Sequence, residues 1–217
     1  MMIRVLVADD HAIIRDGLCM MLGNQPDMEI VGRAANGREA VQLVDKHEPD
    51  VIVIDISMPE LNGIDAIQQM LPGHPNLKVV VLSIHETKPY VYRALRAGAR
   101  GYLLKETAGL EVVDAVRTIH RGERYLSQRI SELLLDAAFL HLETAVDFSL
   151  LETLSPRERE ILQLVAEGKT SQQIGERLFI SPKSVDTYRS RLMHKIGVED
   201  VAGLVKFAIQ QGLISLE

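Results

Sequence analysis

The sequence predicts an α/β fold, a doubly wound sheet of five parallel strands, followed by a smaller all-helical domain. The first observation is the run Val51-Ile52-Val53-Ile54, which is apolar at every position and mostly β-branched, as in a strand that is covered on both faces. The second is an alternation of strand-like and helix-like segments up to about residue 121. The third is a series of well-marked helix starts after residue 154.

The composition is that of a globular protein with two domains. The chain of 217 residues has room for one domain of about 120 residues and a smaller one, and 47% of its residues are apolar. The single cysteine, Cys19, lies in an apolar helical pattern and fits core packing in a reducing cytosol. No run approaches the roughly 18 apolar residues of a membrane span, so we expect a soluble, cytoplasmic protein without a membrane partner.

Five strand candidates alternate with helix candidates in the first domain, which we place at residues 1–122. The strands are expected at 3–8, 29–34, 51–54, 78–82 and 98–104. The helices are expected after each of them, around 14–22, 36–47, 62–71, 88–97 and up to about 121. Such a series predicts a (βα)5 arrangement in which all strands run in parallel.

Polar side chains follow four of these strands. Because the carboxyl ends of parallel strands lie at one edge of the sheet, Asp9, Asp10, Asp55, Ser83 and Lys105 can share one crevice. Three clustered carboxylates repel each other unless a cation lies among them, and their oxygen atoms suit Mg²⁺. A carboxylate is also a competent nucleophile toward a phosphoryl group, whose oxygens the ammonium and hydroxyl groups could hold. The pattern therefore predicts a site that forms an acyl phosphate.

Over about residues 2–122 the chain resembles the receiver domain of bacterial two-component response regulators, a flavodoxin-like fold. The resemblance implies that a histidine kinase donates a phosphoryl group to Asp55 and that Asp9 and Asp10 are the acidic pair. It further implies that Asp10, Asp55 and the carbonyl group of Ser57 hold Mg²⁺. A Mg²⁺ site formed by Asp9, Asp10, Asp55 and Ser57 is therefore expected.

The same resemblance assigns a switch to the last two strands. It makes Ser83 the switch hydroxyl, Tyr102 the aromatic residue that turns inward on activation, and Lys105 the lysine that pairs with the phosphate. Many receivers follow this lysine with a proline in a cis peptide, whereas Glu106 follows it here. The geometry of that loop is the one departure from the pattern.

Residues 123–153 are expected to form a linker with an amphipathic helix. Helical periodicity runs from 127 to 142 through Ile130, Leu133, Leu134, Ala137 and Leu140. It is lost over 143–153, where we expect a flexible boundary. The helix could pack on the first domain or act as a free signalling rod, and the sequence leaves both open.

The C-terminal domain, residues 154–217, begins with three marked helices. Ser155-Pro156-Arg157-Glu158 is a capping box before a helix to Glu167, Thr170 caps a helix to Leu178, and Ser181-Pro182 opens a helix to Ile196. The last two have the spacing of a helix-turn-helix, whose second helix enters the major groove of DNA. That helix carries four basic residues against Asp186, which favours a basic face in a domain of balanced charge.

Motifs across residues 150–214 resemble the LuxR-type domain of NarL/FixJ regulators, a four-helix helix-turn-helix fold. They are Leu-Ser-Pro-Arg-Glu-Arg-Glu-Ile-Leu at 154–162, Gly168-Lys169-Thr170, Ile174-Gly175, Ile180-Ser181 and Ser184-Val185. The resemblance implies that Asp186, Thr187 and Ser190 face bases. It implies phosphate contacts for Lys183, Ser184, Tyr188, Arg191 and Lys195, and pairing of two subunits through Val201, Leu204, Val205 and Ala208. Asp186 and Tyr188 replace a frequent lysine and histidine, so the base preference should differ.

The sequence thus predicts a DNA-binding response regulator, not an enzyme, that dimerises when phosphorylated and then loses its phosphoryl group by autodephosphorylation. An aspartyl-phosphate phosphohydrolase is a rival, but that class usually has a second aspartate where Ser57 stands. A dinucleotide-binding fold is disfavoured because Ala8-Asp9-Asp10-His11 replaces the glycine-rich first turn. A receiver that controls a protein partner without binding DNA also remains open.

Overall fold

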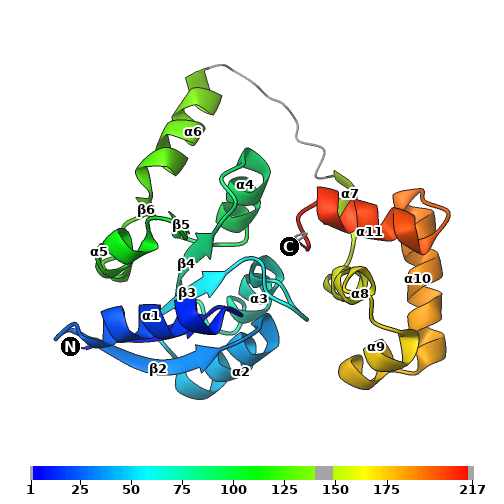
Figure 1. The fold of residues 1–217 in the computed structure, drawn as a ribbon, viewed down its shortest axis with the longest axis horizontal. Coiled ribbons are helices and arrows are strands. Elements are labelled where there is room, and N and C mark those ends of the chain that lie inside the picture. Colours follow the sequence, from blue (N-terminus) through cyan, green and yellow to red (C-terminus); the bar gives the residue numbers. More distant parts are fainter. Residues whose placement is uncertain (1, 140–148, 215–217) are drawn as a thin grey trace. The chain divides into compact units, whose positions relative to one another are not determined.

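The chain forms two compact units, Met1–Thr144 and Ala145–Glu217, in a computed structural model (Figure 1). The structure describes residues 2–139 and 149–214. In the first unit, parallel strands form one sheet in the order β2-β1-β3-β4-β5-β6. Its strands are β1 (Ile3–Ala8), β2 (Met28–Ala34), β3 (Val51–Asp55), β4 (Lys78–Ser83), β5 (Gly101–Leu104) and β6 (Tyr125–Leu126). The predicted parallel α/β fold is confirmed.

The sheet has one strand more than the sequence indicates. β6 is only two residues long, and its residues pair with Gly101 and Tyr102 of β5. Two residues carry no periodicity, so no pattern could reveal this strand. It extends the sheet at the edge where the chain leaves the fifth βα unit.

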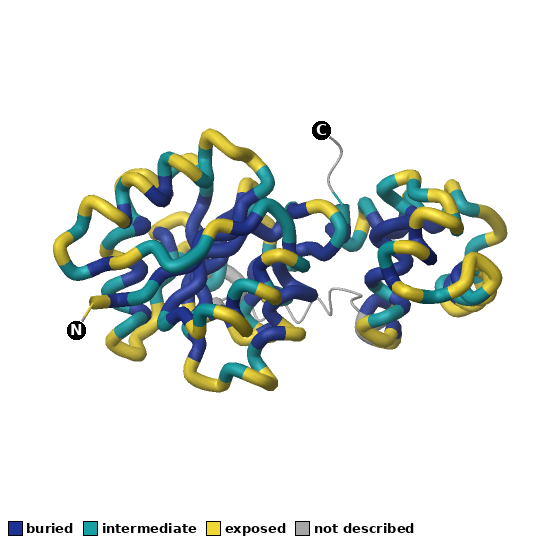
Figure 2. Tube along the Cα trace, turned by 90° about the horizontal axis from the view of Figure 1, so that it is seen from below, coloured by how far each residue is buried: buried dark blue, intermediate teal, exposed yellow. Residues whose placement is uncertain are grey.

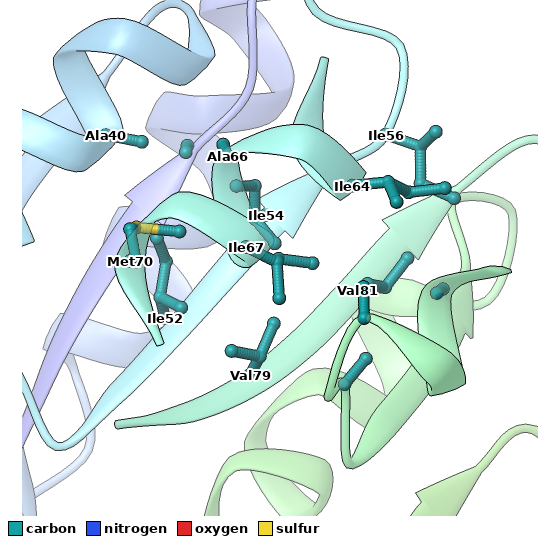
Figure 3. Close-up of a cluster of buried hydrophobic side chains, with 14 of the residues drawn as sticks. Ala40, Ile52, Ile54, Ile56, Ile64, Ala66, Ile67, Met70, Val79 and Val81 are labelled. Carbon is teal, nitrogen blue, oxygen red and sulfur yellow. The ribbon is translucent and has the colours of Figure 1, made fainter. Parts of the chain in front are cut away.

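Helices cover both faces of the sheet. They are α1 (Ala12–Gly23), α2 (Gly37–His47), α3 (Gly63–Met70), α4 (Lys88–Arg96) and α5 (Ala108–His120). Val51 and Val53 pack in the cluster that contains α1 and α5, whereas Ile52 and Ile54 pack in the cluster that contains α2, α3 and α4. Figure 3 shows the second cluster, where Ile52 and Ile54 of β3 face Ile67 of α3. The uninterrupted apolar run is therefore explained by burial on both faces.

The connection after the receiver-like unit is a packed helix rather than a free rod. In α6 (Gln128–Phe139), Ile130 is fully buried, and Leu133 and Leu134 pack against the core of the first unit. The side chain of Ala137 and the whole of Leu140 lie outside the described residues, as does the predicted boundary over 143–148. The expected loss of helix up to 153 is wrong at its end, because α7 (Ser149–Thr153) is helical and buries Leu151 in the second unit.

The second unit contains four further helices, α8 (Pro156–Ala166), α9 (Ser171–Leu178), α10 (Pro182–Ile196) and α11 (Val201–Gln210). The predicted capping box is present, since the Ser155 side chain accepts a hydrogen bond from the Glu158 amide and the Glu158 side chain accepts one from the Ser155 amide. Thr170 caps α9, Ser181 caps α10, and Gly197 ends α10 with a φ of 77°. All three predicted starts follow from local capping chemistry.

One expectation for α11 is wrong. Leu204 and Ala208 are fully buried in the core of the second unit, so they cannot also form a surface that pairs two subunits. Val201 and Val205 are partly exposed. Figure 2 shows buried segments inside each unit and exposed segments at the outer turns. Among the described residues no helix has the length and apolar character that a membrane crossing needs.

Candidate functional site

The predicted acidic residues meet at the carboxyl edge of the sheet. Asp9 follows β1, Asp55 ends β3, and both side chains are almost completely buried. One ligand atom from each of Asp9, Asp10, His11 and Asp55 can be chosen so that all four atoms lie within 4.8 Å of one another. β1 and β3 pair directly in the sheet although they are not consecutive in the sequence. The strand order of the sheet reverses between them. This topology brings the carboxylates together.

Lys105 places its ammonium group between two of these carboxylates. Its Nζ lies 2.8 Å from Asp55 Oδ2 and 2.9 Å from Asp9 Oδ2. Burial raises the pKa of the Asp55 carboxyl, and the charge of Lys105 opposes that rise. Burial alone would lower the pKa of Lys105, but the two carboxylates raise it overall. The lysine is therefore charged, and it contributes one positive charge beside the three carboxylates of Asp9, Asp10 and Asp55.

Two oxygen atoms of the acidic pair remain open. Asp9 Oδ2 and Asp10 Oδ1 are buried and accept no hydrogen bond with good geometry, although Lys105 Nζ and His11 Nδ1 lie 2.9 and 2.8 Å away. In contrast, Asp55 Oδ1 accepts a hydrogen bond from the Ser57 amide at 3.2 Å. Buried carboxylate oxygens without a well-aligned donor suit a hard divalent cation, because such a cation satisfies both charge and lone pairs.

The predicted switch residues meet at His85, a residue that the sequence did not single out. The amide of His85 donates to Ser83 Oγ at 3.0 Å, and its carbonyl oxygen accepts from the hydroxyl of Tyr102 at 2.6 Å. Its ring stacks on Tyr90 with centroids 3.9 Å apart, and its Nε2 lies 3.1 Å from Ser57 Oγ. In the sequence, His85 is marked only by its position two residues after Ser83. Its contacts come from three other segments of the chain, which sequence reasoning does not bring together.

Burial shifts the pKa of two of these side chains. Tyr102 is fully buried, and burial is the main reason why the pKa of its hydroxyl is raised. Burial, together with the charge of Lys105, lowers the pKa of His85. No cis peptide occurs among residues 2–139 and 149–214, so the bond between Lys105 and Glu106 is trans. The loop after Lys105 thus differs from a loop built on a cis proline.

A glycine sets the backbone next to Asp55. Gly63 is the first residue of α3, and a Cβ atom there would collide with the carbonyl oxygen of Asp55. Its amide donates to the carbonyl oxygen of Ile56 at 2.9 Å. Only a residue without a side chain allows this close approach of helix and strand end.

The second unit presents the predicted recognition helix, α10, with most of its polar side chains outward. Lys183, Asp186, Thr187, Ser190, Arg191 and Lys195 are exposed, whereas Ser184 and Tyr188 are partly buried. Tyr188 packs against the core of the unit, so its ring has a structural role in addition to any outer contact.

Two of these side chains have partners on other helices of the unit. The Asp186 carboxylate accepts a hydrogen bond from the hydroxyl of Ser171 in α9 at 2.6 Å. The ammonium of Lys195 donates to both carboxylate oxygens of Glu158 at 2.8 Å. Lys195 thereby ties the end of α10 to the start of α8, and the other exposed lysine and arginine residues of the helix are Lys183 in its first turn and Arg191 in its third.

Comparison with known proteins agrees with both units. Residues 5–117 match the family model described as response regulator receiver domain, and residues 152–208 match the model for bacterial regulatory proteins of the luxR family. The oxygen regulatory protein NreC of Staphylococcus carnosus (strain TM300) is 36% identical over 216 residues, which cover 97% of this chain and 99% of NreC.

Solved structures give the same result. The structure of the response regulator RcsB in a DNA complex aligns with a TM-score of 0.59 and 26% identity, covering 95% of this chain and 98% of RcsB. The receiver domain of the putative response regulator NarL from Mycobacterium tuberculosis aligns with a TM-score of 0.54 and 33% identity, covering 56% of this chain and 98% of that domain. The chain therefore belongs to the NarL/FixJ family and is a DNA-binding response regulator of a two-component system, with a receiver domain and a LuxR-type helix-turn-helix domain.

Proposed function

We propose that Asp55 is the phosphoacceptor of this regulator and that a sensor histidine kinase is the donor. A carboxylate oxygen of Asp55 attacks the phosphorus of a phosphohistidine, so that a new P–O bond forms while the P–N bond breaks and the imidazole leaves with the bonding electrons. The observation that carries this proposal is the pairing of buried Asp55 with Lys105 at 2.8 Å, beside the open oxygens of Asp9 and Asp10.

The residues around Asp55 suit the charge of a phosphoryl group. Lys105 is close enough to exchange its carboxylate partner for a phosphoryl oxygen, and the Ser83 hydroxyl can donate to another. Asp9, Asp10, Asp55 and Ser57 would hold Mg²⁺, which supplies positive charge beside the transferred oxygens. An acyl phosphate in this position can be hydrolysed by water, so the phosphorylated state is transient and the chain acts as a timed regulator.

The contacts of His85 suggest how the loop after β4 responds. When the Ser83 hydroxyl turns to a phosphoryl oxygen, the amide of His85 loses its acceptor. The buried Tyr102 holds the carbonyl oxygen of the same residue, so a shift of His85 displaces that hydroxyl as well. Phosphorylation would thus be coupled to the face formed by α4 and β5, in a two-state manner that requires no large rearrangement of the sheet.

For the output, we propose that residues 154–217 bind DNA as part of a phosphorylation-dependent homodimer, with 1–122 as the receiver and 123–153 as the connection. Thr187 and Ser190 of α10 would face bases, with Asp186 a candidate partner for cytosine, while Lys183, Ser184, Tyr188 and Arg191 would contact phosphates. A phosphate contact by Lys195 would require its ammonium group to break the hydrogen bonds to Glu158.

The acceptor assignment is tested with radiolabelled acetyl phosphate and Mg²⁺. The Asp55→Asn variant should lose the acid-stable, base-labile label that the wild type takes up. Asp65→Asn is the matched control, because Asp65 is also a buried aspartate but lies in the first turn of α3, outside the cluster, where its carboxylate accepts a hydrogen bond from the side chain of the N-cap residue Asn62 at 2.8 Å. Full labelling of Asp55→Asn would move the acceptor to another residue.

The phosphate contact is tested by the salt dependence of DNA affinity. Lys183→Ala should weaken binding to all duplexes and reduce the slope of log K against log salt by about one unit. Lys206 is also an exposed lysine and lies on α11 of the same unit, so Lys206→Ala should leave the slope unchanged. An unchanged slope in Lys183→Ala would refute the contact.

A further inference from the structure

His11 stands at the start of α1 but does not cap it. Its backbone occupies the N-cap position, and its side chain accepts no hydrogen bond from the helix. Instead, its Nδ1 atom lies 2.8 Å from Asp10 Oδ1 and 3.3 Å from Asp9 Oδ1. Serine, threonine, aspartate and asparagine are the usual N-caps, so the helix forgoes a stabilising cap for an imidazole that faces carboxylates.

The spacing of His11 Nδ1 from its two nearest carboxylate oxygens is that of neighbouring ligands around one ion. Ligand atoms at neighbouring corners of an octahedron with bonds of about 2.1 Å lie about 3 Å apart, and opposite ones lie about 4.2 Å apart. The separations of His11 Nδ1 from the two carboxylate oxygens fall at the neighbouring-corner value. The ligand atoms of Asp9, Asp10, His11 and Asp55 all lie within 4.8 Å of one another, somewhat more than the opposite-corner distance, so a bound ion would draw the outermost pair inward.

A second observation concerns the Asp9 side chain. It is completely buried, and its Oδ2 accepts no hydrogen bond of good geometry, as is also true of Asp10 Oδ1. One ammonium group and one imidazole therefore leave one buried oxygen on each of Asp9 and Asp10 without a well-aligned donor. A dication that binds these oxygens would satisfy them.

We propose that His11 is a direct ligand of the divalent cation at this site, through Nδ1, and that it shifts the preference of the site from Mg²⁺ toward first-row transition metals such as Mn²⁺ and Co²⁺. The inference rests on the metal site of the proposed function. Imidazole nitrogen suits transition metals, whereas Mg²⁺ prefers oxygen ligands and retains water. An all-oxygen site would lack this source of discrimination.

The competing interpretation is that His11 is only a hydrogen-bonded partner of Asp10. In that case a bound cation would displace the imidazole or leave it outside the first coordination shell. The two interpretations differ in whether nitrogen is bound to the metal, which can be measured without any phosphoryl-transfer assay.

The test uses the full-length protein without a histidine tag. Electron spin echo envelope modulation of bound Mn²⁺ should show ¹⁴N coupling in the wild type and lose it in His11→Gln. His74→Gln is the matched control, because His74 also lies beside an aspartate, with Nε2 2.7 Å from Asp45 Oδ1, but outside the cluster. This control should keep the coupling.

Calorimetric titrations with Co²⁺ and Mg²⁺ give the second readout. His11→Gln should lower Co²⁺ affinity on the order of tenfold, the lower end of the range for loss of a group that supports a metal site. Mg²⁺ affinity should stay near the wild-type value. Wild-type protein without ¹⁴N coupling, coupling that persists in His11→Gln, or an equal loss for both ions would overturn the proposal.

The same titrations separate this inference from the proposed function. Asp10→Asn should weaken both ions strongly, because it removes a shared carboxylate ligand. If the wild type binds both ions but shows no nitrogen coupling, His11 is not a ligand and the metal site itself stands. If the wild type binds neither ion, the metal part of the proposed function fails as well.

Discussion

Replacing Lys105 by methionine tests whether its ammonium group balances the buried carboxylates. The side chains of Asp9 and Asp55 are 0% and 1% exposed, and that of Lys105 is 9% exposed, so solvent screens this pair weakly. Removing one partner of a buried ion pair costs about 3–5 kcal/mol. Protonation of a carboxylate offers some relief, so we expect the free energy of unfolding of the receiver to fall by about 3 kcal/mol at pH 7 without divalent ions.

The pH dependence has a definite sign. Burial already raises the pKa of Asp55, and loss of the lysine charge raises it further, so the folded variant binds more protons than its unfolded chain. Its stability should therefore fall as pH rises from the unfolded pKa of about 3.9 through the raised folded pKa. The loss relative to wild type should be smaller at pH 5 than at pH 7.

The assay is urea unfolding read by hydrogen exchange and mass spectrometry of β3 and β4 peptides, which follows the receiver separately from the second unit. Lys78→Met is the control, because Lys78 opens β4 and has no ion pair among the described residues. A loss in Lys105→Met no larger than in this control, or one that grows as the pH is lowered from 7 to 5, would refute the charge-balance argument.

Two further substitutions test the backbone at the site and the scaffold of the second unit. Gly63→Ala should displace the end of β3, slow phosphoryl uptake by Asp55 and lower the free energy of unfolding by about 1–3 kcal/mol. Gly73→Ala is the control, because the nearest atom to its added Cβ lies at 3.8 Å, and it should change neither phosphoryl labelling nor urea unfolding. Burial raises the pKa of Glu158, but the hydrogen bonds from Lys195 bring this pKa below its usual value. The stabilising contribution of Glu158 is therefore present above its unfolded pKa and is lost as the pH falls through its folded pKa. Glu158→Gln should therefore flatten the acid side of the stability profile of the second unit, and an unaltered profile would exclude this role.

Local chemistry was sufficient to predict most elements of both units. The unbroken apolar run of β3 requires cover on both faces, and the caps at Asn36 and Ser155 mark the starts of α2 and α8. These signals involve residues that are at most a few positions apart. Once the strands are predicted to run in parallel, their carboxyl ends lie at one edge of the sheet, and Asp9, Asp55 and Lys105 are predicted to meet there.

Features that depend on distant contacts escaped prediction. β6 exists because its two residues find the free edge of β5, and His85 becomes central only when Ser57, Tyr90 and Tyr102 surround it. From the sequence, the apolar stripe of α11 could equally have faced a partner subunit. In the structure, Leu204 and Ala208 are buried in the core of their own unit.

By itself, the sequence determined the family, the order of the helices and strands, and which polar groups converge at the sheet edge, because periodicity, capping and strand ends are written in neighbouring residues. Only the tertiary structure decided which of two possible partners each ambiguous side chain takes. Lys195 meets Glu158 across two helices, and His11 turns from its helix to the carboxylates of Asp9 and Asp10. The contact of Lys195 depends on the distance between helices far apart in the chain, and that of His11 on which of two nearby groups its imidazole turns to, and no local pattern encodes either.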